Sequence, residues 1–142
     1  MTKVKVINKS ENPLPMYMTK GAAAVDLCAN EVVEVKPNTT AIIGTGLYVA
    51  IPEGYEIQIR SRSGLAAKSD VFVLNSPGTI DSDYRGELKV ILRNLSLQVL
   101  DIRIGDRIAQ AVLAPVVQIE WETVEELDET ERGTGGLGST KV

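Results

Sequence analysis

Short segments in which apolar and polar residues alternate recur along the chain, and this pattern limits what it can fold into. Alternation of this kind occurs at residues 3–7, 32–35, 55–60 and 88–92. A period of two residues is that of a β-strand with one face buried and the other in water. Turn-forming residues separate the segments at 36–38, 52–54, 76–78 and 104–106. Short strands at such regular spacing predict an all-β sandwich or barrel.

Two longer apolar runs, residues 41–51 and 108–119, are rich in Val and Ile and contain Gly44, Gly46 and Pro115. Glycine and proline inside β-branched runs favour bent strands over helices. The best helix candidate is a turn or two at residues 64–68. We find no internal repeat and no second domain in the sequence.

Composition excludes several classes of function. A chain of 142 residues with 44% hydrophobic content suits one compact domain. The net charge of −4, without a long basic run, argues against duplex nucleic acid as a partner, and six aromatic residues give no stacking platform for single strands. No apolar run could span a membrane and the N-terminus lacks a secretory signal, so we expect a cytoplasmic protein.

The sequence contains no histidine, which restricts the chemistry available to it. A general base must therefore be a carboxylate, Lys, Tyr or Cys. The single cysteine, Cys28, cannot form an internal disulfide and has apolar neighbours. We interpret it as a small buried hydrophobic residue rather than a reactive thiol.

The segment 78–87 holds an unusual density of ionisable groups between two apolar strands. A turn needs its glycines and Asx residues, but a turn alone does not need Asp81, Tyr84, Arg85 and Glu87 together. We interpret the segment as an active-site hairpin.

Three further segments each allow two interpretations. Asp26 stands in an apolar strand, where an unpaired charge is costly, so a structural ion pair with an arginine is the simpler explanation. Residues 60–66 combine two arginines, two serines and a glycine, which describes either a solvated basic turn or a phosphate-binding turn. Residues 105–110 are either a turn followed by an ordinary strand or a site carrying Gln110.

The C-terminal end differs in character from the rest. Residues 120–131 carry seven acidic side chains and no basic one, and residues 132–142 contain four glycines. Such an end is either disordered or a loop whose backbone N–H groups approach phosphate oxygens.

Taken together and in order, these five segments resemble the five motifs of the trimeric deoxyuridine triphosphate nucleotidohydrolases (dUTPases). The motifs correspond to residues 23–29, 62–66, 78–87 with Asn75 upstream, 105–110 and 132–140. The resemblance implies a jelly-roll-like β-barrel that forms a homotrimer, with three active sites shared between chains. We therefore expect a β-barrel catalytic domain at 1–124 and an acidic linker with a flexible Gly-rich, site-closing tail at 125–142.

The resemblance also implies a role for individual residues. Asp81 matches the base that activates water, and Tyr84 matches the ring that packs under deoxyribose and excludes a 2′-hydroxyl. The uracil-reading group is Asn75, Gly78, Thr79, Ile80, Asp81 and Lys89. The phosphate contacts are Arg62, Ser63, Gly64 and Gln110. The closing tail consists of Arg132, Gly136, Leu137, Gly138, Ser139 and Thr140.

The implied reaction is hydrolysis of dUTP to dUMP and pyrophosphate, which limits uracil incorporation into DNA and supplies dUMP for dTMP synthesis. The implied cofactor is Mg²⁺, held mainly by the substrate phosphates, with Asp26 reaching it through water. Without histidine, a carboxylate such as Asp81 is the natural base.

The sequence departs from the family pattern at four places. Ala24 replaces a usual Gly, Ser61 a usual Pro, and Lys141 a usual Gly beyond the last motif. Leu137 replaces the usual Phe that stacks on uracil, which predicts weaker substrate capture with the chemistry intact. Three alternatives stay open: a deaminase related to the dCTP deaminases, a catalytically idle nucleotide-sensing or protein-binding barrel, and a structural jelly-roll protein.

Overall fold

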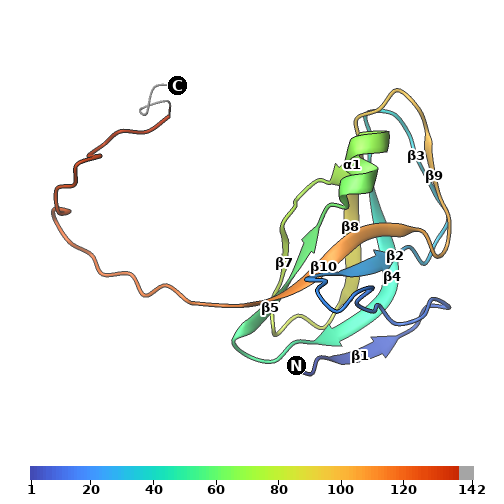
Figure 1. The fold of residues 1–142 in the computed structure, drawn as a ribbon, viewed down its shortest axis with the longest axis horizontal. Coiled ribbons are helices and arrows are strands. Elements are labelled where there is room, and N and C mark those ends of the chain that lie inside the picture. The colour runs from blue at the N-terminus through green and yellow to red at the C-terminus, as the bar shows by residue number, and fades with distance from the viewer. Residues whose placement is uncertain (138–142) are drawn as a thin grey trace.

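The computed structural model describes residues 1–137, and most of its regular structure consists of antiparallel strands (Figure 1). One four-stranded sheet contains, in order, β1 (Lys5–Asn8), β4 (Thr40–Ala50), β8 (Glu87–Asn94) and β6 (Val71–Val73). The second contains β2 (Val25–Cys28), β10 (Arg107–Pro115), β5 (Tyr55–Arg60) and β7 (Gly78–Ile80). A small third sheet pairs β3 (Val33–Val35) with β9 (Leu100–Ile102). The all-β prediction is confirmed.

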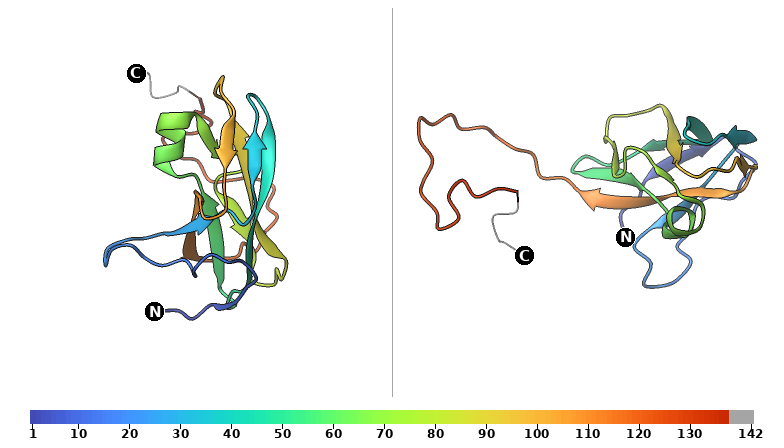
Figure 2. Two further views of the ribbon diagram at one scale, coloured as in Figure 1. Left: turned by 90° about the vertical axis from the view of Figure 1, so that its right-hand side faces the viewer. Right: turned by 90° about the horizontal axis from the view of Figure 1, so that it is seen from above.

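The two larger sheets face one another and enclose the core (Figure 2). Strand β8 shows why the sequence alternates: Leu88, Val90 and Leu92 are buried, whereas Lys89 between them is exposed. Fully burying one such side chain stabilises the fold by about 1.5–3 kcal/mol.

A single short helix, α1 (Ser63–Ser69), lies in the described part of the chain and confirms the helix expected at 64–68. No helix among residues 1–137 is long and apolar enough to cross a membrane.

Strand β10 ends earlier than the apolar run 108–119 predicts. Its last residue is Pro115, and the N–H of Val116 still donates to the carbonyl of Gly54 at 2.9 Å. Beyond this point the chain leaves the barrel as an extended arm (Figure 1), which we call the C-terminal arm (residues 117–137). Its side chains Val117 and Trp121 are 93% and 84% exposed, because none of residues 1–137 covers them.

Strand β4 contains a bulge, residues 45–47, where its register with β8 shifts between Gly44 and Tyr48. Gly46 adopts a φ of +71°, a conformation that favours glycine. The buried Thr45 hydroxyl donates to the carbonyl of Leu88 at 2.7 Å. This contact replaces part of the ladder that the bulge interrupts.

The two apolar strands predicted around the segment 78–87, β6 and β8, pair antiparallel as in a hairpin, but the segment between them contains a further strand, β7. Strand β7 pairs with β5 in one sheet, whereas β8 pairs with β4 and β6 in the other. The segment therefore crosses from one sheet to the opposite one. Strand β7, inside the segment, lies in a different layer from β6 and β8, which alternation alone does not reveal.

Ala24, a departure from the family pattern, fits its place. Among residues 1–137, only Asn38 and Asp70 adopt positive φ without being glycine. The backbone at Ala24 therefore does not need the glycine that relatives use, as we predicted.

Asn94 gives a test of how the barrel end is held. Its side chain is fully buried, and its amide nitrogen donates to the carbonyls of Val35 and Gln98, both at 2.8 Å. Its oxygen accepts the N–H of Ser96 at 2.9 Å. We expect Asn94→Ala to lower the free energy of unfolding by about 2–4 kcal/mol, since it leaves buried groups without partners.

Urea denaturation at one fixed protein concentration measures this effect, because any assembly makes stability depend on concentration. The matched control is Ser96→Ala, which removes only exposed side-chain bonds and should cost less than about 1 kcal/mol. Equal losses in the two variants would contradict the prediction.

Candidate active site

Three of the predicted motifs meet at one end of the second sheet. Gln110 on β10 is paired with Asp26 on β2 and with Arg60 on β5. The Nε of Arg62 donates to Oδ1 of Asp26 at 3.0 Å. The ion pair between Asp26 and an arginine, one of the two interpretations of Asp26, is therefore present. It joins the motif at residues 23–29 to the motif at residues 62–66.

Arg107 belongs to the same group, although sequence reasoning did not select it. Its Nη1 donates to Oδ2 of Asp26 at 3.3 Å, and its carbonyl accepts from Nη1 of Arg62 at 3.0 Å. We call Asp26, Arg62, Arg107 and Gln110 the Asp26 cluster. The only available signal for Arg107 was its place in the fourth motif, directly after Asp106.

The Asp26 cluster is suited to an anion. Two guanidinium groups share one carboxylate, so the three side chains carry a net charge of about +1. The side chains of Asp26 and Arg62 are 17% and 23% exposed, which limits screening by water. Ser63 and Gly64 are exposed at the start of α1, next to Arg62.

Two neighbours of the cluster bear on earlier predictions. Burial, followed by the nearby Asp26 carboxylate, raises the pKa of the Cys28 thiol, while Arg107 and Arg62 oppose this rise. A raised pKa keeps the thiol protonated at neutral pH, in line with a structural cysteine. Ser61, where relatives have Pro, uses its hydroxyl to accept the N–H of Val73 at 2.9 Å.

A second group of predicted residues lies on and after β7. The Asn75 amide sits over Gly78, where a Cβ would lie 2.8 Å from its nitrogen. Strand β7 is at the edge of its sheet, with Thr79 exposed and Ile80 half-buried. Asp81 follows it, exposed to solvent, and lines a groove of about 980 Å³ together with Thr79 and Arg85.

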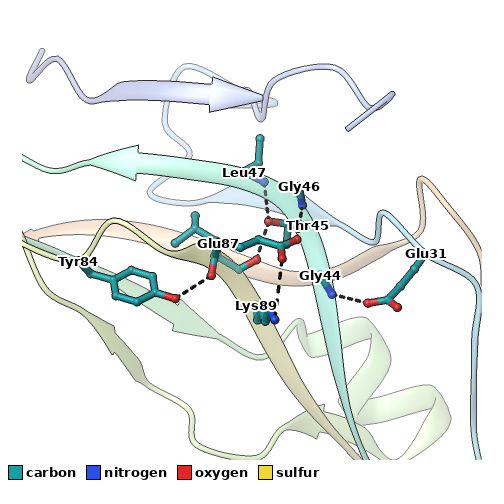
Figure 3. A network of polar contacts seen from close by, with 9 residues as sticks. Glu31, Gly44, Thr45, Gly46, Leu47, Tyr84, Glu87 and Lys89 are labelled. Atoms are coloured by element: carbon teal, nitrogen blue, oxygen red, sulfur yellow. Dashed lines mark hydrogen bonds and ion pairs between the residues drawn. The ribbon is translucent and has the colours of Figure 1, made fainter. Parts of the chain in front are cut away.

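The ring of Tyr84 is fixed although it is 42% exposed. Its hydroxyl donates to the carbonyl of Glu87 at 3.0 Å, as Figure 3 shows. A Cβ on Gly86 would lie 2.5 Å from Cζ of the ring, so only glycine leaves this space free. The ring of Tyr84 therefore packs directly against the backbone of Gly86.

Lys89, the remaining residue predicted to read uracil, lies on β8, opposite Gly44 of β4. Its side chain is on the outer face of the first sheet, with Nζ 3.9 Å from Oε2 of Glu87. The carbonyl of Ile91 accepts from the N–H of Leu74 at 2.8 Å. In a strand, the backbone N–H and C=O groups of residues i and i+2 point to the same side. Those of Lys89 therefore point to the same side as the carbonyl of Ile91, toward the region beyond the end of β6 at Val73.

The structure does not bring Asp81 to the Asp26 cluster. Ile80 pairs with Ile57 near the start of β5, whereas Arg62 follows the opposite end of that strand. Five residues of extended chain between Ile57 and Arg62 span roughly 16 Å. One chain therefore holds the two groups at opposite ends of β5.

The third group, on the C-terminal arm, is separate from both. The Nε of Arg132 donates to the carbonyl of Gly135 within the arm, and Leu137 is fully exposed. Gly136 lies between them. Gly138, Ser139 and Thr140 lie outside the described residues.

An all-β barrel with a cationic cluster and a separate exposed carboxylate has groups suited to a phosphate ligand. Comparison with known proteins is more specific. The family model described as dUTPase matches residues 10–141. The chain belongs to the dUTPase family.

Individual relatives agree with this assignment. The chain is 57% identical over 138 residues to the deoxyuridine 5′-triphosphate nucleotidohydrolase of Nautilia profundicola, covering 97% of this chain and 96% of the relative. It is 52% identical over 140 residues to the protein of the same name from Finegoldia magna, covering 97% and 98%. The solved dUTPase of Staphylococcus bacteriophage 80alpha with dUPNHPP has a TM-score of 0.91 at 29% identity and full coverage of both chains.

Proposed function

We propose that the chain is a dUTP diphosphatase, which hydrolyses dUTP to dUMP and pyrophosphate. The observation that carries the proposal is the exposed Asp81 beside the fixed ring of Tyr84. Both residues belong to a chain more than half identical to proteins named for this activity. The reaction removes a precursor of uracil in DNA and yields the precursor of dTMP.

Asp81 acts as the general base in this proposal. It orients a water molecule and takes its proton as the water oxygen bonds to the α-phosphorus. The bond from that phosphorus to the bridging oxygen breaks, and pyrophosphate leaves. Positioning and charge neutralisation supply most of the catalysis of such a transfer. The exposed carboxylate faces a groove in which a water has room.

Uracil is read by backbone groups in this proposal. The outer edge of β7, with Thr79, has no strand beside it among residues 1–137, and the backbone of Lys89 points past the end of β6. Such edges offer N–H and C=O groups to a base. Cytosine presents the opposite donor and acceptor pattern, which leaves these groups unpaired and disfavours its binding. Asn75 and Gly78 shape the approach to this edge.

The active site is shared between chains of a homotrimer in this proposal. Arg62 lies roughly 16 Å along β5 from Ile57, the residue opposite Ile80, which separates the predicted phosphate contacts from Asp81 of the same chain. A second chain then supplies one of the two groups. The exposed apolar residues of the C-terminal arm, such as Val117 and Trp121, also call for a covering surface. The arm then delivers Arg132 and residues 136–140 to close the site.

The donor set fits a Mg²⁺ ion held mainly by substrate. Among residues 1–137 no three His, Cys, Asp or Glu side chains cluster to hold a metal. Asp26 binds one arginine with each oxygen and keeps a lone pair on each for a metal-bound water. The ion would supply positive charge along the phosphates. A related phage phi11 dUTPase, 27% identical with a TM-score of 0.82, is described with a structural Mg(II) ion. A cytoplasmic location remains a prediction.

Asp81→Asn tests the base. The amide keeps the shape of the side chain but cannot take a proton, so kcat on dUTP should fall at least about 100-fold. Pyrophosphate release, measured on dUTP with dCTP, dTTP and UTP as controls, gives the result. An inactive wild-type chain would favour an idle barrel, and ammonia release from dCTP would favour a deaminase.

Subunit mixing tests the shared site. Asp81→Asn and Arg62→Ala chains, each nearly inactive alone, should regain activity when co-assembled. Random mixing of equal amounts gives about one quarter of sites an intact Asp81 and an intact Arg62 from different chains. No recovery in verified mixed assemblies would mean that both residues act from one chain.

Leu137→Phe tests the arm. An aromatic ring stacked on a base contributes roughly 1–3 kcal/mol. The substitution should therefore lower KM for dUTP with little change in kcat. Steady-state kinetics measures both constants, and Leu137→Met is a control of similar size without a ring. An unchanged or higher KM would contradict the prediction.

A further inference from the structure

Glu87 stands where the segment carrying Asp81 and Tyr84 enters β8, and it touches both the ring and the neighbouring strand (Figure 3). Its carbonyl accepts the hydroxyl of Tyr84 at 3.0 Å. Its Oε1 accepts the N–H of Gly46 in the β4 bulge at 2.9 Å. Glu87 thus links the ring of Tyr84 to the neighbouring strand β4.

The bulge explains why a side chain is needed there. The register of β4 and β8 is regular from Thr40 to Gly44 and resumes only at Tyr48, opposite Glu87. Between these points, the N–H of Gly46 has the Glu87 carboxylate as its partner. Gly44 leaves room for that carboxylate, because a Cβ there would lie 2.5 Å from Oε1 of Glu87.

A second glutamate holds the same strand without touching the ring. Oε1 of Glu31 accepts the N–H of Gly44 at 2.6 Å, on the side of the bulge away from Tyr84 (Figure 3). Glu31 and Glu87 are therefore chemically alike anchors of β4. Of the two, Glu87 is the one that also contacts Tyr84.

We propose that Glu87 is a positioning residue for sugar selection. Its carboxylate fixes the peptide whose carbonyl holds Tyr84, and the ring excludes a 2′-hydroxyl. Without the bond to Gly46, the carbonyl and the ring shift, and a ribose finds space. The inference rests on the proposed contact between Tyr84 and the sugar. It adds a residue whose side chain touches no substrate.

The test compares kcat/KM for dUTP with kcat/KM for UTP in four variants. Glu87→Ala should lower this ratio by about tenfold, because a small displacement of the Tyr84 ring weakens the exclusion of the 2′-hydroxyl of UTP. Glu87→Gln keeps an oxygen for Gly46 and should stay within about twofold of wild type. Glu31→Ala removes the matched anchor and should leave the ratio unchanged. Thermal denaturation of each variant confirms folding and compares the two losses of stability.

The fourth variant, Tyr84→Ala, separates the role of Tyr84 in sugar selection from the positioning role of Glu87. If it leaves the ratio unchanged, Tyr84 does not select the sugar and this inference fails with that role. If Tyr84→Ala lowers the ratio and Glu87→Ala does not, only the positioning role is overturned. An equal fall in Glu31→Ala would also overturn it, because the effect would then come from loosening β4. Should Glu87→Ala not fold, Glu87→Asp, whose carboxylate is one methylene shorter, takes its place with the same expected fall.

Discussion

The register of strand β5 governs where the chemistry of this protein can occur. One neighbour, β10, brings Gln110 beside Arg60, and the other, β7, places Ile80 beside Ile57. Both pairings are fixed by the alternation that buries Ile57 and Ile59, since a slip of one residue would expose them. Packing of the core therefore also sets the separation between the phosphate-side and sugar-side groups. The active site that we propose, which uses both groups, therefore draws on more than one chain.

The carboxylates of Asp26, Glu87 and Asp81 have different surroundings, and each makes different interactions as a result. Asp26 is mostly buried between two arginines, so its charge is used to hold Arg62 and Arg107. Glu87 accepts a backbone N–H and stabilises a bulge. Asp81 is exposed beside a groove, which leaves its oxygens free for water. In a chain without histidine, this availability supports the proposed role of Asp81 as the base.

The sequence predicted the fold better than it predicted how the segments meet. Alternation located β3, β5 and β8 because burial on one face is a local property. It also located β1, whose four residues are nevertheless all exposed. The short strands β7 and β9 were not predicted. The crossing of residues 78–87 between sheets was missed because it depends on pairing with β5, which is distant in the chain. Arg107 was missed because its partner Asp26 is 81 residues away. The strand predicted to continue to 119 ends at Pro115, the last β10 residue with a partner on β5, because no strand in the described part of the chain pairs beyond it.

The extended arm has an optical consequence. Trp121 is the only tryptophan in the chain, and it lies on the arm with its indole almost fully in water. Its fluorescence, excited at wavelengths that the four tyrosines do not absorb, therefore reports on the arm alone. A shift of its emission to shorter wavelength would signal that the ring has moved into an apolar contact. The protein thus carries a native reporter of where its arm lies, and no label needs to be attached.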